Sequence, residues 1–390
     1  MWIFGSFSRV FLFSAIHPHG YDDFKLDSLP LNQEHNDSVR LLQNTEMLRN
    51  YSSIYRVETY ALQGERPYME DECFVSHDGR LCAIFDGHGG SDVSRFSRSN
   101  IFAFFQTALT EYFYRKSCNG KRQRKVWEGK NPDRNTTNTK ATYYTSPLKE
   151  TEVDASSPIS SPIHLRNNVV PSTIDACNYA LRTALHKLDH EILRVPQWRF
   201  QGTTAVAILI HEQGEEPKRH VISANIGDSR AVLSRRGIAI DLSIDHKPND
   251  PNEKHRINKL GGQVDWYGMV DGNTGEPLLD TGVFRINGNL AVSRSLGDKS
   301  ERPFVSSEPD IKVFPILNDL DEFIVLASDG IFDVMSSQEV VSFLHRHHAI
   351  NRSSSILPQH NILAKTLAEE AIRRGSLDNV SVIIVWLKTI

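Results

Sequence analysis

The sequence predicts an α+β domain built in layers. Its short apolar segments, which are typical of strands, are joined by turns of hairpin length, and its helical segments occur in pairs. The chain has 390 residues, of which 39% are hydrophobic, and it can therefore bury one large core or two ordinary ones. Together these observations favour packed layers over a doubly wound parallel sheet.

Regular structure is predicted to begin near Ser53. Residues 55–62, 72–77 and 81–85 are short strand-like runs separated by polar or glycine-bearing turns. A helix follows with Ser91 or Asp92 as its N-cap, because the next apolar side chains recur at helical spacing. Those side chains are Val93, Phe96, Ile101, Phe104 and Ala108. We expect this apolar face to pack on a sheet.

The second half of the chain adds further strands and helices. A helix is predicted at 172–193 from its apolar spacing. Strand-like runs follow at 203–210, 219–227, 230–236, 321–328 and 379–387. Three more helices are predicted at 251–260, 336–346 and 361–375. The first of these begins with a proline, and the second opens with a capping box formed by Ser336 and Glu339.

Two segments depart from this pattern. Residues 1–52 form an N-terminal extension whose apolar start, interrupted by Arg9, is too short for a membrane span. It is either a targeting segment or a poorly ordered terminus. Residues 115–171 are rich in Lys, Arg, Asn, Thr, Ser and Pro, so we expect a basic, disordered insertion inside one domain of residues 53–390. The run KRQRK at 121–125 is either an import or anion-binding patch or a solvated loop.

Four aspartates stand at the ends of predicted strands. Asp86 and Asp329 each precede a glycine after a buried-looking strand, while Asp228 and Asp378 flank two other apolar strands. Any one of them could be an ordinary turn former. Four together indicate a shared site if the strand ends meet, and clustered carboxylates resist ionisation unless a cation neutralises them. Oxygen ligands favour Mg²⁺ or Mn²⁺ over zinc, and the missing side chain of Gly87 would let its carbonyl oxygen approach the ion.

Two such ions would point to phosphoester hydrolysis, because together they activate a water and polarise a phosphoryl oxygen. Arg66 could bind the phosphate, and the nearby Glu70 and Asp71 could hold metal-bound waters, although a surface ion cluster is the alternative. His88 is either a general acid or a hydrogen-bonded structural histidine. A phosphate-binding glycine loop is disfavoured, because DGHGG lacks the GxGxxG spacing and no GxxxxGK[ST] occurs.

Taken together, these motifs resemble the metal-dependent protein serine/threonine phosphatases of type 2C. The matching segments occur in the family's order from about residue 53 to the end, interrupted mainly by the 115–171 insertion. They are QGERPYMED (63–71), FDGHGG (85–90), GTTAVAILI (202–210), ANIGDSRAVL (224–233), DHKP (245–248), INGNLAVSRSLGD (286–298), SSEPDI (306–311), ASDGIFDVMS (327–336) and LDNVSVIIV (377–385). The resemblance implies a central sandwich of two antiparallel β-sheets flanked by helical layers, with a metal site in a cleft at one end.

The resemblance also assigns metal ligands by motif position. Asp86 would bridge two Mg²⁺ or Mn²⁺ ions, and the Gly87 carbonyl would bind one of them. The remaining positions are Asp329 and Asp378 for the other ion, Glu70 and Asp71 acting partly through water, and Asp228 and Asp333 for a weaker third metal.

The implied reaction is direct attack of metal-bridging water on phosphoserine or phosphothreonine, without a phosphoenzyme. Arg66 would bind the substrate phosphate, His88 would be the candidate acid, and Thr204 matches a motif threonine near the site whose role is left open. The absence of a CxxxxxR loop agrees with this mechanism. Residues 264–284 run longer than is common in the family, in a region that resembles the flap beside the substrate cleft. They either alter substrate choice or form an enlarged surface loop.

The sequence also limits the partners. A net charge of −4 gives no overall basic field for nucleic acid, which ranks a metal-dependent nuclease last. We expect phosphorylated proteins as substrates, a monomer, and no membrane span. The alternative function is that of a catalytically weak pseudophosphatase that binds proteins. Such a protein would be expected to have lost a metal carboxylate, yet Asp86, Asp329 and Asp378 are all present.

Cysteine usage bears on the compartment. The four cysteines, Cys73, Cys82, Cys118 and Cys177, show neither CxxC spacing nor a dense framework, so we expect free thiols in a reducing compartment. This favours the cytoplasm or the nucleus, with organelle targeting by the apolar N-terminus as the other destination.

Overall fold

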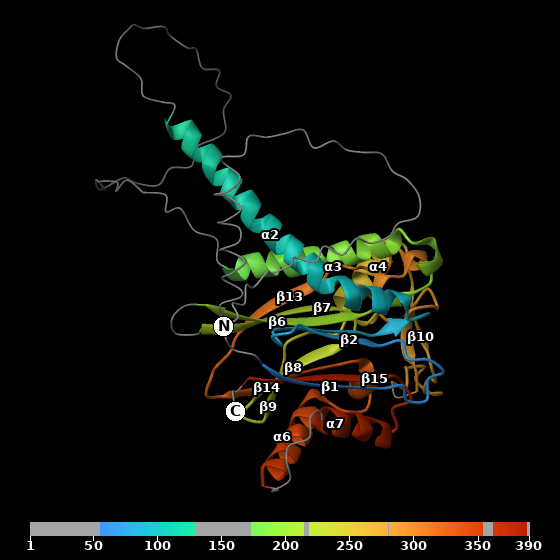
Figure 1. Cartoon of the computed structure of the whole chain (residues 1–390). Helices are drawn as coiled ribbons and strands as arrows, with labels where there is room; N and C mark the ends of the chain where they lie inside the picture. Colours follow the sequence, from blue (N-terminus) through green and yellow to red (C-terminus); the bar gives the residue numbers. More distant parts are fainter. Residues whose placement is uncertain (1–54, 129–172, 214–217, 280, 354–361, 388–390) are drawn as a thin grey trace, which may run out of the picture.

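The computed structural model describes residues 55–128, 173–213, 218–279, 281–353 and 362–387. Within them, two five-stranded sheets lie face to face, and a pair of helices covers the outer face of each sheet (Figure 1). All strand pairs within the two sheets are antiparallel. The predicted α+β sandwich with four layers is therefore confirmed.

The two sheets combine strands from distant parts of the chain. The first has the order β1 (Arg56–Leu62), β15 (Val380–Trp386), β14 (Asp321–Ala327), β8 (Arg230–Arg235) and β9 (Ile238–Asp241). The second has the order β13 (Asp310–Pro315), β7 (Lys218–Ile226), β6 (Ala205–Gln213), β3 (Leu81–Phe85) and β2 (Glu72–Val75). Strand β1 lies near the start of the described chain and β15 near its end. Because the two strands pair, both ends of the chain belong to the same sheet.

Burial on both faces explains the purely apolar sequence of β3. Cys82 and Ile84 belong to the core between the two sheets, whereas Leu81, Ala83 and Phe85 pack against the helices outside. All five side chains are buried. A strand that is covered on both sides has no polar face, so its sequence is continuously apolar instead of alternating.

Four helices form the outer layers. Helices α2 (Asp92–Glu128) and α3 (Thr173–Leu193) cover the second sheet, and α6 (Ser337–Ser353) and α7 (Ile362–Arg373) cover the first. The predicted capping box of α6 is confirmed, because Ser336 N–H donates to Glu339 Oε2 at 2.9 Å and Glu339 N–H donates to Ser336 Oγ at 3.3 Å. The buried Glu58 of β1 accepts a bond of 2.9 Å from Leu363 N–H and so caps α7.

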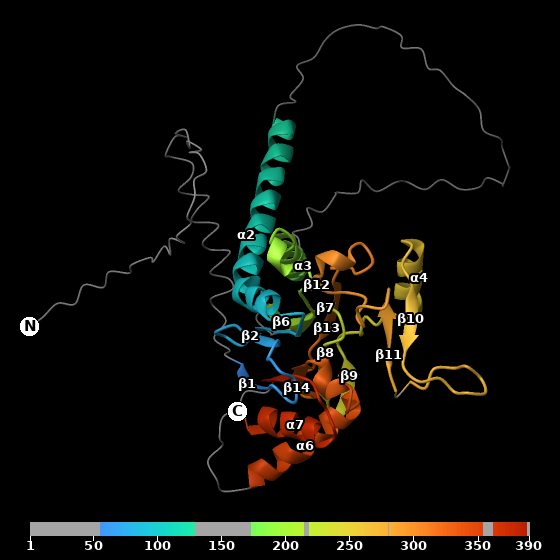
Figure 2. The same cartoon turned by 90° about the vertical axis from the view of Figure 1, so that its right-hand side faces the viewer.

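Helix α2 is longer than the sequence pattern indicated. The expectation of a disordered insertion from residue 115 is wrong for its first part, because the helix continues to Glu128. Figures 1 and 2 show this end of α2 projecting away from the sheets. This part of the sequence lacks apolar periodicity, but its Lys, Arg and Gln residues favour the helical state. The rest of the predicted insertion, residues 129–171, and the N-terminal extension lie outside the described residues.

A smaller unit stands beside the sandwich (Figure 2). Helix α4 (Pro251–Lys259) and the hairpin of β10 (Val264–Tyr267) and β11 (Val283–Ile286) share a small core of their own with Val305. The long segment 264–284 is thus closed at its base by a hairpin, within which the Asp271 carboxylate accepts hydrogen bonds from the N–H groups of Asn273 and Thr274.

Cys73, Cys82 and Cys177 are free thiols, as predicted, and the side chain of the fourth cysteine lies outside the described part. Among the described residues, no helix has the length and apolar character needed to cross a bilayer.

Candidate functional site

Antiparallel register brings the predicted aspartates together in two pairs. In the second sheet, the end of β3 and the end of β7 both meet the start of β6, which places Asp86 near Asp228. In the first sheet, the end of β14 lies beside the start of β15, which places Asp329 near Asp378. The two pairs face each other across the sandwich, since all of the other three aspartates act electrostatically on Asp86.

Burial and mutual repulsion oppose the ionisation of carboxylates in this cluster. Desolvation and the neighbouring carboxylates raise the pKa values of Asp86 and Asp329 well above the ordinary value. Burial, as the main cause, raises the pKa of Asp71 to about 6. Its Oδ2 atom is buried without a hydrogen-bond partner. One unpartnered carboxylate oxygen in a cluster of like charges fits a hard divalent cation, which would accept the oxygen as a ligand and offset the repulsion.

Two basic side chains contact this cluster in the structure. Arg66 contacts Asp378 at 2.6 Å, and Lys247 Nζ contacts Asp228 at 2.5 Å. In the described ranges, no three His, Cys, Asp or Glu side chains are grouped closely enough to hold one ion. The predicted Arg66 therefore lies at the site, whereas Lys247 was missed, although it directly follows Asp245 and His246 in the quoted DHKP motif.

Gly87 allows the Glu70 backbone to approach closely, while the predicted approach of its own carbonyl to a metal ion stays a prediction. It lies in β4 (Gly87–His88), and a Cβ atom at this position would stand 2.4 Å from the Glu70 carbonyl oxygen. Ser94 Oγ donates to the same carbonyl at 2.5 Å. Any side chain at position 87 would push these segments apart, which explains the glycine.

Asn379 fixes the loop that carries Arg66 and Glu70. Its Oδ1 atom accepts a bond of 2.8 Å from Glu70 N–H, and its Nδ2 atom donates to the carbonyls of Gln63 at 2.7 Å and Tyr68 at 3.0 Å. Sequence reasoning missed this role. One feature of the sequence could have indicated it: the polar pair Asp378-Asn379 stands at the start of a buried strand, where an apolar residue would be expected.

Thr204 and Asp333 also lie at the cluster. Thr204 N–H donates to the Asp86 carbonyl at 2.8 Å, and its hydroxyl lies 2.8 Å from Ser229 Oγ, so it positions the strand end that carries Asp86. Asp333 follows the short helix α5 (Asp329–Phe332), one turn after Asp329. Desolvation and the Asp228 carboxylate raise its pKa despite Lys247, which places it beside the other acidic groups.

His88 contacts a buried carboxylate that the sequence analysis did not select. Its Nε2 atom lies 2.7 Å from Asp298 Oδ2. Burial opposes the charged imidazole, but the Asp298 carboxylate outweighs it and raises the pKa of His88. Asp298 was hard to predict from the sequence, because His88, which it contacts, is 210 residues away in the chain.

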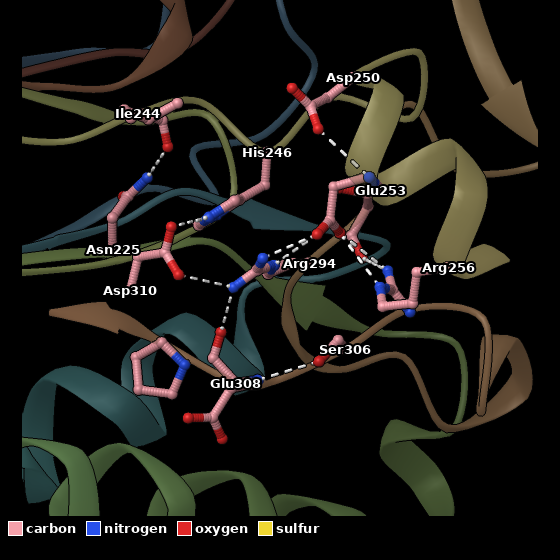
Figure 3. Close-up of polar contacts among 12 residues, drawn as sticks. Asn225, Ile244, His246, Asp250, Glu253, Arg256, Arg294, Ser306, Glu308 and Asp310 are labelled. Atoms are coloured by element: carbon pink, nitrogen blue, oxygen red, sulfur yellow. Dashed lines mark hydrogen bonds and ion pairs between the residues drawn. The ribbon is translucent and has the colours of Figure 1, made fainter. Parts of the chain in front are cut away.

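A second polar network joins His246, Asp310, Arg294 and Glu253 (Figure 3). His246 Nδ1 accepts a bond of 3.1 Å from Gly227 N–H, and its Nε2 atom contacts Asp310 at 3.2 Å. Arg294 bridges Asp310 at 3.1 Å and Glu253 of α4 at 2.7 Å (Figure 3). This chain of contacts ties the small unit beside the sandwich to the loop that carries Asp228.

Comparisons with known proteins agree with this architecture. A sequence model described as protein phosphatase 2C matches residues 162–380. Protein phosphatase 2C 53 of rice, Oryza sativa subsp. japonica, is 30% identical over 329 residues, which cover 78% of this chain and 58% of the relative. The chain belongs to the protein phosphatase 2C family. Probable protein phosphatase 2C 8 of the same plant is 40% identical over 194 residues, covering 48% of this chain and 42% of the relative. The chain thus spans about half the length of these two relatives.

Solved structures show the protein phosphatase 2C fold directly. The serine-threonine phosphatase 2C of Toxoplasma gondii superimposes with a TM-score of 0.55 at 19% identity, covering 86% of this chain and 95% of that one. A C. elegans sex determining protein gives a TM-score of 0.59 at 22% identity, with coverages of 94% and 77%. These likenesses establish the fold of the chain.

Proposed function

We propose that this protein phosphatase 2C chain is a metal-dependent protein serine/threonine phosphatase. The observation that carries the proposal is the meeting of four strand-end aspartates beside Arg66 in a member of this family. Mg²⁺ or Mn²⁺ would be held by Asp86, the Gly87 carbonyl, Asp329 and Asp378, with Glu70 and Asp71 acting partly through water. Asp228 and Asp333 would serve a weaker third ion.

The ions would supply an activated water and polarise the phosphoryl group. The residues of the chain do the rest. Arg66 binds the phosphate of the substrate, which requires it to exchange Asp378 for the phosphate oxygens. His88 donates a proton to the departing serine or threonine oxygen, a role in which the raised pKa favours the charged form of the ring. Thr204 and Asn379 hold the strand end and the loop that carry these groups.

Phosphorylated proteins are the proposed substrates, and a monomer in the cytoplasm or nucleus is the proposed state. A pseudophosphatase that only binds proteins is disfavoured, because the predicted aspartates are all retained and act electrostatically on one another.

The first prediction tests the metal mechanism. Turnover of a phosphothreonine peptide is measured with added Mn²⁺, with EDTA, and with the Asp329→Ala variant. We expect turnover only in the first condition, because the other two remove the ion or one of its ligands. Equal turnover in all three would defeat the metal mechanism. No turnover in any of them by folded protein would favour the binding function.

A further inference from the structure

His88 is held by a carboxylate that lies outside the proposed metal ligands. Strand β4 pairs with β5 (Gly202–Thr203), and β5 pairs with β12 (Leu296–Gly297), so His88, Gly202 and Gly297 lie side by side. Asp298 follows Gly297 directly, and its side chain is 3% exposed. The register of this small sheet therefore places the Asp298 carboxylate next to the His88 ring.

The Asp298 backbone is fixed in a conformation that few aspartates adopt. Its φ angle of 46° lies in the left-handed region, which costs free energy and persists only where the surroundings determine it. Asp298 N–H donates to the Gln201 carbonyl at 2.9 Å, and Ser295 Oγ donates to Oδ2 at 2.5 Å. The buried Asp189 of α3 accepts a bond of 2.9 Å from the preceding peptide, at Gly297 N–H. Helix α3 and the small sheet together hold the carboxylate in place.

Gly202 leaves just enough room for the contact. A Cβ atom at this position would stand 2.0 Å from Asp298 Oδ2 and 2.5 Å from His88 Nε2. The His88 ring and the Asp298 carboxylate therefore make contact directly beside Gly202. Any other residue at position 202 would separate them.

We propose that Asp298 is a positioning residue that fixes the His88 ring through Nε2–H and so leaves Nδ1–H to meet the leaving group. The inference rests on the proposed phosphatase function. As the bond between phosphorus and the water oxygen forms, the bond to the serine oxygen breaks and that oxygen keeps the electron pair. It then takes the proton from Nδ1, and the proton released by the attacking water restores the imidazolium. Asp298 touches neither substrate nor water in this step.

Leaving-group dependence tests the inference kinetically. With Mn²⁺, Asp298→Asn should lower kcat on a phosphoserine peptide about 10- to 100-fold, the usual effect of losing a residue that orients a functional histidine. It should hardly change turnover of p-nitrophenyl phosphate, whose leaving group needs little protonation. In a His88→Ala background the same substitution should add nothing, because its effect passes through His88. Equal losses on both substrates, or additive losses, would overturn the inference.

Glycine variants provide a matched pair in case Asp298 variants fold poorly. Gly202→Ala should separate Asp298 from His88 and give the same selective loss on phosphoserine. Gly272→Ala, where a Cβ would meet nothing within 4 Å, should behave as the unchanged chain. A Gly202→Ala enzyme with full phosphoserine turnover would contradict the proposed positioning.

A spectroscopic measurement separates this inference from the proposed function. In histidine-labelled, metal-free protein, a long-range ¹H–¹⁵N spectrum reports which ring nitrogen carries the proton, and the His88 signals are assigned by their loss in His88→Ala. We expect an Nε2–H signal that shifts in Asp298→Ala, whether or not the protein turns over phosphate. An unchanged His88 signal would refute the positioning role. An inactive wild type with the expected spectrum would refute only the phosphatase function.

Discussion

At the scale of single residues, Asn379 shows how one amide organises a site. Its three hydrogen bonds connect the start of β15 to the loop that carries Arg66 and Glu70. Asn379→Ala should destabilise the protein by about 1–3 kcal/mol, because it removes three part-buried hydrogen bonds. It should also raise KM for phosphopeptides, since Arg66 would no longer be held near the phosphate.

Urea unfolding and steady-state kinetics check this prediction. Asn318→Ala is the control, because Asn318 contacts Arg219 on the exposed surface and lies in none of the site contacts. If the two alanine variants were equally stable and equally active, Asn379 would have no organising role.

At single residues, the sequence indicated the aspartates and Arg66 of the site but not Lys247, Asp298 or Asn379. Asp86 and Asp329 could be predicted because an Asp-Gly pair after an apolar run is visible locally. Asp298 and Asn379 could not, because each acts on a partner that is more than 200 residues away in the chain, at separations of 210 and 309. Long-range pairing of this kind depends on the register of the sheets, which the sequence alone does not display.

At the scale of elements, Glu253 anchors α4 to the sandwich. The carboxylate is buried between Arg294 at 2.7 Å and Arg256 at 2.9 Å (Figure 3). Burial opposes its ionisation, but the hydrogen bonds from these arginines outweigh burial and lower the pKa of Glu253 to about 2. A lowered pKa means that the folded state binds this proton more weakly than the unfolded state does.

The Glu253→Gln variant should therefore show a pH-dependent loss of stability. Above the unfolded pKa of about 4.5 the wild type should be more stable by about 1–2 kcal/mol, allowing for solvent screening. The difference should shrink as pH falls below 4.5 and be lost once the pH is below the folded pKa of about 2. Chemical unfolding at several pH values measures it, and a difference that stayed constant across this range would contradict the assignment.

The start of a helix could be predicted from the sequence where residues close to it in the chain determine it. The capping box of α6 and the proline that starts α4 were readable because their partners lie within four residues. The extension of α2 to Glu128 was not, since a projecting helix lacks the apolar face on which the prediction relied. The hairpin inside 264–284 was hidden for a similar reason, because its two strands are short and far apart in sequence.

At the scale of the whole molecule, electrostatic repulsion between carboxylates is concentrated at the end of the sandwich where the strand-end aspartates meet. The layers bury apolar side chains on both faces of each sheet, which favours folding. The same packing brings four aspartates, at positions 71, 228, 329 and 378, close enough to Asp86 to oppose its ionisation. In the absence of a cation, Arg66 and Lys247 compensate only part of this charge.

The metal-free protein should therefore gain stability when one of these carboxylates is neutralised. Asp329→Asn should raise the Tm of EDTA-treated protein, because it removes a charge that its neighbours destabilise. Mn²⁺ should raise the Tm of the wild type by mass action and should have a much smaller effect on Asp329→Asn, which lacks a proposed ligand. Asp265→Asn, on the exposed face of β10, should change neither value. A metal-free Asp329→Asn protein that melts below the wild type would show that repulsion does not dominate at this end of the sandwich.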